Sequence, residues 1–112
     1  MDKSKIKLEH HGAQDYQSLL MHQEAVRMVC DNPALIHRLL ETLQRWDRQL
    51  DRSSKNLRDQ WVVIINNRDW DKAIEDSELG NQLRQASPMA TLLPNKVRFD
   101  IIRKIRSLKD AA

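Results

Sequence analysis

The sequence has few of the residues that break helices or crosslink chains. It contains 2 Gly, 3 Pro and a single Cys among 112 residues. With so few breakers and few runs of β-branched residues, we expect helices joined by short turns. One cysteine cannot form an internal disulfide or a cysteine-based metal centre, which is typical of a protein from a reducing compartment.

Long apolar segments are missing as well. No run approaches the roughly 20 residues that cross a bilayer, and residues 1–12 lack the apolar centre of a secretion signal. We therefore expect a cytoplasmic protein with no membrane partner. Apolar residues make up 40% of the chain and charged residues 31%, which is the balance of a globular domain rather than of a disordered chain.

The chain divides into a short arm and one helical domain. Residues 1–14 alternate in charge and polarity around Gly12 and predict a flexible arm, in which His10 and His11 are solvated rather than metal-bound. For residues 15–112 we expect a single all-α domain, a compact bundle of about five to six short helices.

The first helix should begin after Asp15, a good N-cap residue. Its apolar stripe contains Leu19, Leu20, Ala25, Val26, Val29 and Cys30. Burial in such a stripe would leave the Cys30 thiol inert rather than nucleophilic.

The second helix, over residues 33–50, has the clearest pattern. Asn32 can cap it, and Pro33 suits its first position because that N–H has no helical partner. Its apolar face contains Ile36, Leu39, Leu40, Leu43, Trp46 and Leu50, and its polar face Arg38, Glu41, Arg45 and Arg48. The apolar face must be buried, either within its own domain or in a homodimer.

The third helix should cover residues 55–67, with Ser53 or Ser54 as its cap. Its inward residues are Leu57, Trp61 and Ile64 or Ile65. The run VVII would also suit a strand, but a single short strand would have nothing to pair with, which favours the helix.

Two shorter helices should follow, the first starting at Asp69 and the second capped by Ser77. Their inward residues are Trp70, Ile74, Leu79, Leu83 and Ala86. Gly80 either weakens the second of these helices or marks a close contact between helices. Trp46, Trp61 and Trp70 then lie inward on three helices, which predicts a shared aromatic cluster, with a ligand pocket or an interface as the alternative.

Two prolines frame the next corner of the chain. Ser87 suits an N-cap and Pro88 a first helical position, so SPMATLL predicts one short buried helical turn. Its core residues are Met89, Leu92 and Leu93. Pro94 should then start the last helix, over residues 95–109.

The last helix is both amphipathic and basic. Its apolar face contains Val97, Phe99, Ile101, Ile102, Ile105 and Leu108. Its cations, the candidate residues for binding a partner or a nucleic acid, are Lys96, Arg98, Arg103, Lys104, Arg106 and Lys109. Such a helix can lie along phosphates, dock on an acidic protein, or pack on its own core with a solvated basic face.

Signs of catalysis and of metal or cofactor binding are weak. The segment HQEAV at His22 lacks the second histidine of the His-Glu-x-x-His zinc motif. His37 and Glu41 lie four residues apart, which suits a surface pair, and no further ligands follow at a metal-site spacing. There is no Gly-rich phosphate loop and no serine elbow. We expect no enzyme, no metal and no cofactor.

Several short segments resemble one family. They are HQEAV at His22–Val26, DNPALI at Asp31–Ile36, Arg45-Trp46, Trp61 and LRQASPMATLLP at Leu83–Pro94. Together, over about residues 20–103, they resemble a family of small bacterial helical proteins with a Leu-Arg-Gln-(Ser or Ala)-Ser-Pro motif. The chain departs from that pattern at Met89, where the family has Phe, and at Gln23, which weakens any inherited role for His22.

The resemblance implies a protein linked to toxin–antitoxin or mobile-element loci, and it implies no catalytic residue. We expect a non-enzymatic interaction or regulatory protein, antitoxin-like or accessory, that binds a partner protein such as a toxin. The alternative is a nucleic-acid-binding protein that uses the basic C-terminal helix on phosphates.

Overall fold

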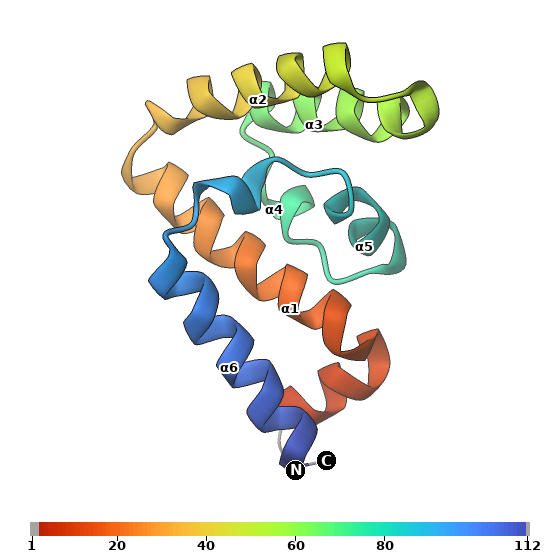
Figure 1. Cartoon of the computed structure of the whole chain (residues 1–112), viewed down its shortest axis with the longest axis vertical. Coiled ribbons are helices and arrows are strands. Elements are labelled where there is room, and N and C mark those ends of the chain that lie inside the picture. Colours follow the sequence, from red (N-terminus) through yellow and green to blue (C-terminus); the bar gives the residue numbers. More distant parts are fainter. Residues whose placement is uncertain (1–2, 112) are drawn as a thin grey trace.

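The computed structural model describes the backbone of residues 3–111 and the side chains of residues 12–111. This part of the chain contains six α-helices, two 3₁₀ helices and no strand, so the all-α prediction is confirmed (Figure 1). The helices are α1 (Lys3–Asp31), α2 (Leu35–Gln49), η1 (Arg52–Ser54), α3 (Lys55–Asn67), α4 (Trp70–Ala73), α5 (Glu78–Arg84), η2 (Met89–Leu92) and α6 (Asn95–Ala111).

Helix α1 is the centre of the arrangement. Figure 1 shows α6 running antiparallel beside it, with α4 and α5 on its other side and the α2–α3 pair across its C-terminal end. The short η2 also packs on α1, between the α4–α5 side and α6. No helix among residues 3–111 combines the length and the apolar character needed to span a bilayer.

The start that we predicted for the first helix, after Asp15, is wrong. Helix α1 begins at Lys3 and is interrupted at Gly12, where φ is 75° and ψ is 159°. Glycine lacks a Cβ and so adopts this positive φ at little cost, which places the break there rather than at Asp15. The side chains of His10 and His11 lie outside the described residues, and the flexibility of residues 1–14 stays a prediction.

Helix α2 begins later than Pro33 because residues 32–37 form a tighter turn. The carbonyl oxygens of Asn32 and Pro33 accept hydrogen bonds from N–H groups three residues on, at 3.0 and 3.1 Å. No side chain caps the helix. Leu50 lies beyond the end of α2 and is 51% exposed, so its predicted burial is also wrong.

The apolar face of α2 is buried within its own domain. Leu39 and Leu43 are fully buried, and α2 packs chiefly against α3. This side of the helix is therefore not free to form a homodimer. Helix α3 has the predicted bounds, with Trp61 and Ile65 buried, which confirms the helix over the strand.

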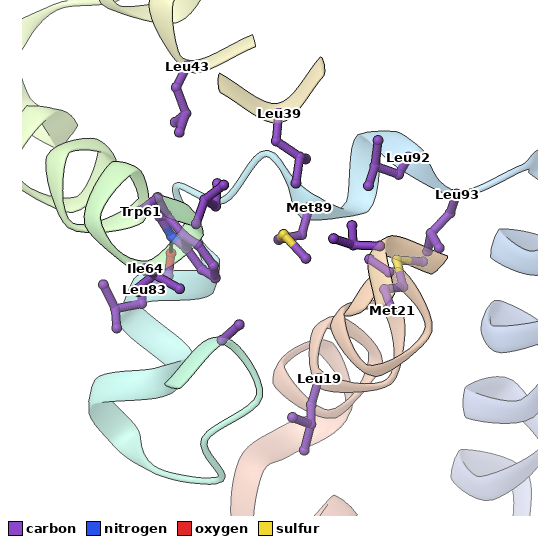
Figure 2. Close-up of a cluster of buried hydrophobic side chains, with 14 of the residues drawn as sticks. Leu19, Met21, Leu39, Leu43, Trp61, Ile64, Leu83, Met89, Leu92 and Leu93 are labelled. Carbon is purple, nitrogen blue, oxygen red and sulfur yellow. Dashed lines mark hydrogen bonds between the residues drawn. The ribbon is translucent and has the colours of Figure 1, made fainter. Parts of the chain in front are cut away.

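The corner after Ser87 fills the core as predicted. Met89, Leu92 and Leu93 are all buried. Figure 2 shows Leu39 of α2 pointing toward Met89, with Trp61 of α3 nearby. The short turn is a 3₁₀ helix, and the hydroxyl oxygen of Ser87 accepts a hydrogen bond from the Met89 N–H at 3.0 Å.

Besides Leu50, three further expected burials are wrong. Cys30 is exposed, Leu79 is 48% exposed and Phe99 is 57% exposed. The buried face of α1 passes through Ala25 and Val29, and each further residue turns about 100° around a helix, which carries Cys30 away from that face.

The predicted aromatic cluster does not form among the described side chains. Trp61 is buried, whereas Trp46 and Trp70 are only half-buried. The ring contact of Trp61 is with His22 instead, at 5.8 Å between ring centroids.

Candidate functional site

A buried histidine–serine pair joins the two most distinctive motifs of the sequence. His22 lies in α1 and is 2% exposed. Its Nδ1 is 2.7 Å from the carbonyl oxygen of Ser18, and its Nε2 is 2.7 Å from Oγ of Ser87. A carbonyl oxygen can only accept, so Nδ1 carries the proton and the Ser87 hydroxyl donates to Nε2.

This hydrogen-bonding pattern requires a neutral imidazole. The pKa of His22 is lowered to about 4, chiefly by burial; the hydrogen bond to Ser18 opposes this shift and the nearby Arg84 charge adds to it. His22 is therefore uncharged at neutral pH, with Nε2 free to accept from Ser87.

The pair has the donor–acceptor order of a serine nucleophile and its base, but its surroundings differ from a catalytic site. A nucleophile must reach its substrate, and the base here is almost fully enclosed. The Ser87 oxygen also accepts from the Met89 N–H, which fixes it as the cap of η2. We interpret the pair as a crosslink that holds the corner after α5 against α1.

Neighbouring polar groups fix the same corner. The indole N–H of Trp61 donates to the carbonyl oxygen of Leu83 at 2.6 Å. Arg84, also buried, donates from Nη1 to the Glu75 carbonyl oxygen at 2.9 Å and from Nη2 to Oδ1 of Asn81 at 2.8 Å. Burial lowers the pKa of Arg84, with nearby carboxylates opposing that shift.

The absence of a side chain at Gly80 lets α5 lie close to the loop that joins it to α4. A Cβ added at Gly80 would overlap the carbonyl oxygen of Glu75, which is backbone and cannot swing away. The predicted contact between helices is not what Gly80 makes: its close neighbour is the backbone of the loop between α4 and α5. The stretch from Leu83 to Pro94 thus holds the fold together through buried contacts.

A second buried guanidinium ties α2 to α3. Nε of Arg58 donates to Oδ1 of Asp47 at 2.8 Å, and Nη2 donates to the Asp51 carbonyl oxygen at 2.9 Å. Nη1 of Arg58 bonds Oγ of Ser54, so Ser54 occupies the cap position of α3 without capping it. Asp51 instead caps η1 by accepting from the Ser53 N–H at 3.0 Å. The sequence does not indicate this network, because its polar residues follow no helical spacing and form no known motif.

The basic helix α6 packs on α1 through Ile101 and Ile105, which are buried. Five of its six candidate cations are exposed, namely Lys96, Arg103, Lys104, Arg106 and Lys109. Arg98 is half-buried and donates from Nη2 to the Ala90 carbonyl oxygen at 2.8 Å, so it anchors α6 to η2. The structure therefore divides the predicted set into five surface cations and one structural contact.

Phe99 lies among these cations and not in the buried face. It is separated from Ile101 by about 200° around the helix, which turns it outward. Lys96 and Arg103 lie three and four residues away from Phe99, so all three share one side of α6. We define the outer face of α6 as Lys96, Phe99, Arg103 and Arg106.

Positive charge is concentrated on α6. The helix carries 6 of the chain's 19 Lys and Arg but only 2 of its 16 Asp and Glu. The rest of the chain has 13 cationic and 14 acidic residues and is nearly neutral. On the outer face, Arg103 is paired with Asp100 of the preceding turn.

Metal binding finds no support among the described side chains. In residues 12–111, no three His, Cys, Asp or Glu side chains gather as a metal site requires. His37 and Glu41 form the predicted surface pair, with Nε2 2.8 Å from Oε1.

Comparison of the chain with protein-family models, curated proteins and solved structures found no match. The family resemblance, and the regulatory role that it implies, therefore stay predictions.

Proposed function

We propose that this protein is a non-enzymatic interaction protein, an antitoxin-like or accessory regulator, that binds a partner protein through the outer face of α6. The observation that carries the proposal is the exposed Phe99 set among cations. Its side chain contributes little to the core, since it is 57% exposed.

The composition of this face favours a protein partner. Aromatic residues and arginine are enriched in the buried centres of protein interfaces, where an aromatic anchor enters a pocket of the partner. Full burial of an exposed Phe side chain contributes about 1.5–3 kcal/mol to binding, and Phe99, being 57% exposed, can supply part of that. The flanking Lys96, Arg103 and Arg106 would favour a partner whose surface is acidic.

Nucleic acid is the alternative, and the concentration of positive charge on α6 supports it. Two features weigh against it. Asp100 and Asp110 are exposed on the same helix and would repel phosphates. Arg98 is held by the Ala90 carbonyl, which reduces the cations available for a backbone.

The mechanism is steric. A helical protein without catalytic groups regulates by covering a surface of its partner, and an antitoxin acts on a toxin in this way. The family resemblance supports such a role but identifies no particular partner.

Capture from the native host tests the proposal. Tagged wild-type protein should retain one stoichiometric protein partner, and the variant Phe99→Ser with Arg103→Glu should lose it. Leu50→Ser is the matched control, since Leu50 is also about half exposed but lies far along the chain from α6. A partner that stays bound to the α6 variant, or no stoichiometric partner with the wild type, contradicts the proposal.

Binding to labelled duplex and single-stranded oligonucleotides tests the alternative. We expect no binding at physiological salt. Tight binding would favour the nucleic-acid alternative if the binding constant falls by roughly one power of the salt concentration for each phosphate contacted.

A further inference from the structure

One segment of this chain is as acidic as α6 is basic. Residues 69–78 carry five carboxylates and one Lys, a net charge of −4, whereas α6 carries six cations and two carboxylates, a net charge of +4. We define the acidic side as Asp69, Asp71, Glu75, Asp76 and Glu78, all of which are exposed.

Apolar surface accompanies the acidic side, as it does the outer face of α6. Val63 is 57% exposed, and it lines a hollow of about 160 Å³ together with Ile64, Gln60, Asp69 and Lys72. A cavity of about 150 Å³ is large enough to hold benzene, so this hollow has the size of one phenyl ring.

The two surfaces lie on different sides of the same molecule. Helix α6 packs chiefly on α1, while α4 packs on α3 and α5, on the other side of α1 (Figure 1). Phe99 points to solvent from α6 and does not fill the hollow of its own chain. The hollow beside Val63 is therefore open to the Phe99 side chain of a second copy.

From this complementarity we propose that the protein associates head to tail, with the outer face of α6 of one copy docked on the acidic side of a second copy. The inference rests on the proposed function in that both use the same face of α6. Phe99 enters the hollow beside Val63, and Lys96 and Arg103 face Asp69 and Asp71.

Such contacts have three consequences. Because the two docked surfaces differ, a dimer still has one free outer face of α6 and one free acidic side. Further copies can therefore add to it. The paired patches are small, which makes association weak. Charge attraction between exposed groups is screened by salt, so association falls as ionic strength rises.

Analytical ultracentrifugation of the purified full chain tests the proposal, over roughly 10–500 µM, the range in which small interfaces assemble. The wild type should grow past the dimer at low salt and dissociate at high salt. Variant A, Phe99→Ala with Arg103→Ala, loses the basic face. Variant B, Asp69→Asn with Asp71→Asn, loses the acidic side, and Asp69 caps no N–H of α4.

Each variant alone should stay monomeric, and an equal mixture of A and B should form a dimer that grows no further. This pairing is specific to a head-to-tail interface, since A keeps the acidic side and B keeps the basic face. Leu50→Ser should associate like the wild type, and circular dichroism should show unchanged helix content in both variants. A monomeric wild type, self-association of A or B alone, or a mixture that grows past the dimer overturns the proposal.

The outcome also separates this inference from the proposed function. Variant B keeps the outer face of α6 and should still capture the foreign partner. If the wild type captures that partner but remains monomeric at every concentration, self-association is wrong and the proposed function stands. If variant A captures the partner as well as the wild type does, the proposed function is wrong.

Discussion

Lowering the pH should destabilise this protein through one buried side chain. His22 is neutral in the folded chain because burial lowers its pKa to about 4, from 6.5 for the unperturbed group. Between those two pH values the unfolded chain binds a proton that the folded chain does not. The stability contributed by neutral His22 is therefore present above about pH 6.5 and is lost as the pH falls toward 4.

The magnitude follows from the two pKa values. The difference in proton binding between the folded and unfolded chains lowers the free energy of unfolding by about 2 kcal/mol from neutral pH to pH 5, and by about 3 kcal/mol at pH 4. Hydrogen bonds from Arg58 and Ser53 lower the pKa values of Asp47 and Asp51 respectively. Those carboxylates lose their contribution only as the pH falls through about 4 and below, so they add little to the change between pH 7.5 and pH 5.

Urea denaturation between pH 7.5 and pH 5 measures this loss. We expect the free energy of unfolding of the wild type to fall by about 2 kcal/mol and that of His22→Gln to change far less, because glutamine does not titrate. His37→Gln is the control, since it removes a histidine whose imidazole lies on the surface, and most of the loss of stability should remain in this variant. If His22→Gln loses as much stability as the wild type over this range, then His22 is not the buried neutral group that we describe.

Two further substitutions test the corner around α5. Trp61→Phe replaces the buried indole with a smaller phenyl ring and removes the donor to the Leu83 carbonyl, so it should cost at least about 1–3 kcal/mol in guanidinium denaturation. An unchanged midpoint would contradict both the buried position of the indole and its hydrogen bond to Leu83. Gly80→Ala should lower the melting temperature although alanine favours helices by about 1 kcal/mol, because the new Cβ overlaps Glu75. Gln82→Ala, at an exposed position of the same helix, should leave the melting temperature nearly unchanged, and a stabilised Gly80→Ala would contradict the close contact.

Local sequence signals were enough to predict much of the fold. The bounds of α3 follow from its apolar spacing, and the capping role of Ser77 is confirmed by its bond to the Gly80 N–H at 3.0 Å. The burial of Met89 and Leu93 after the Ser-Pro pair is also confirmed. Each of these features depends on residues within a few positions of one another.

The features that were missed depend on contacts between distant parts of the chain. The bond between His22 and Ser87 joins residues 65 positions apart, and no local pattern indicates it. The burial of Arg84 depends on carbonyl oxygens that a loop brings into place. The outward position of Phe99 could have been found from its angle to Ile101 alone, since Ile101 and Ile105 define the packed side of α6.

Phe99, the anchor of the outer face of α6, should be dispensable for folding because its side chain is largely exposed. The most direct test compares the free energies of unfolding of Phe99→Ala and Met89→Ala with that of the wild type. We predict a loss within about 0.5 kcal/mol for Phe99→Ala, as at other exposed positions, and a loss of about 2–5 kcal/mol for Met89→Ala in the core. A loss at Phe99 as large as that at Met89 would show that the ring is packed within the domain and would contradict the account.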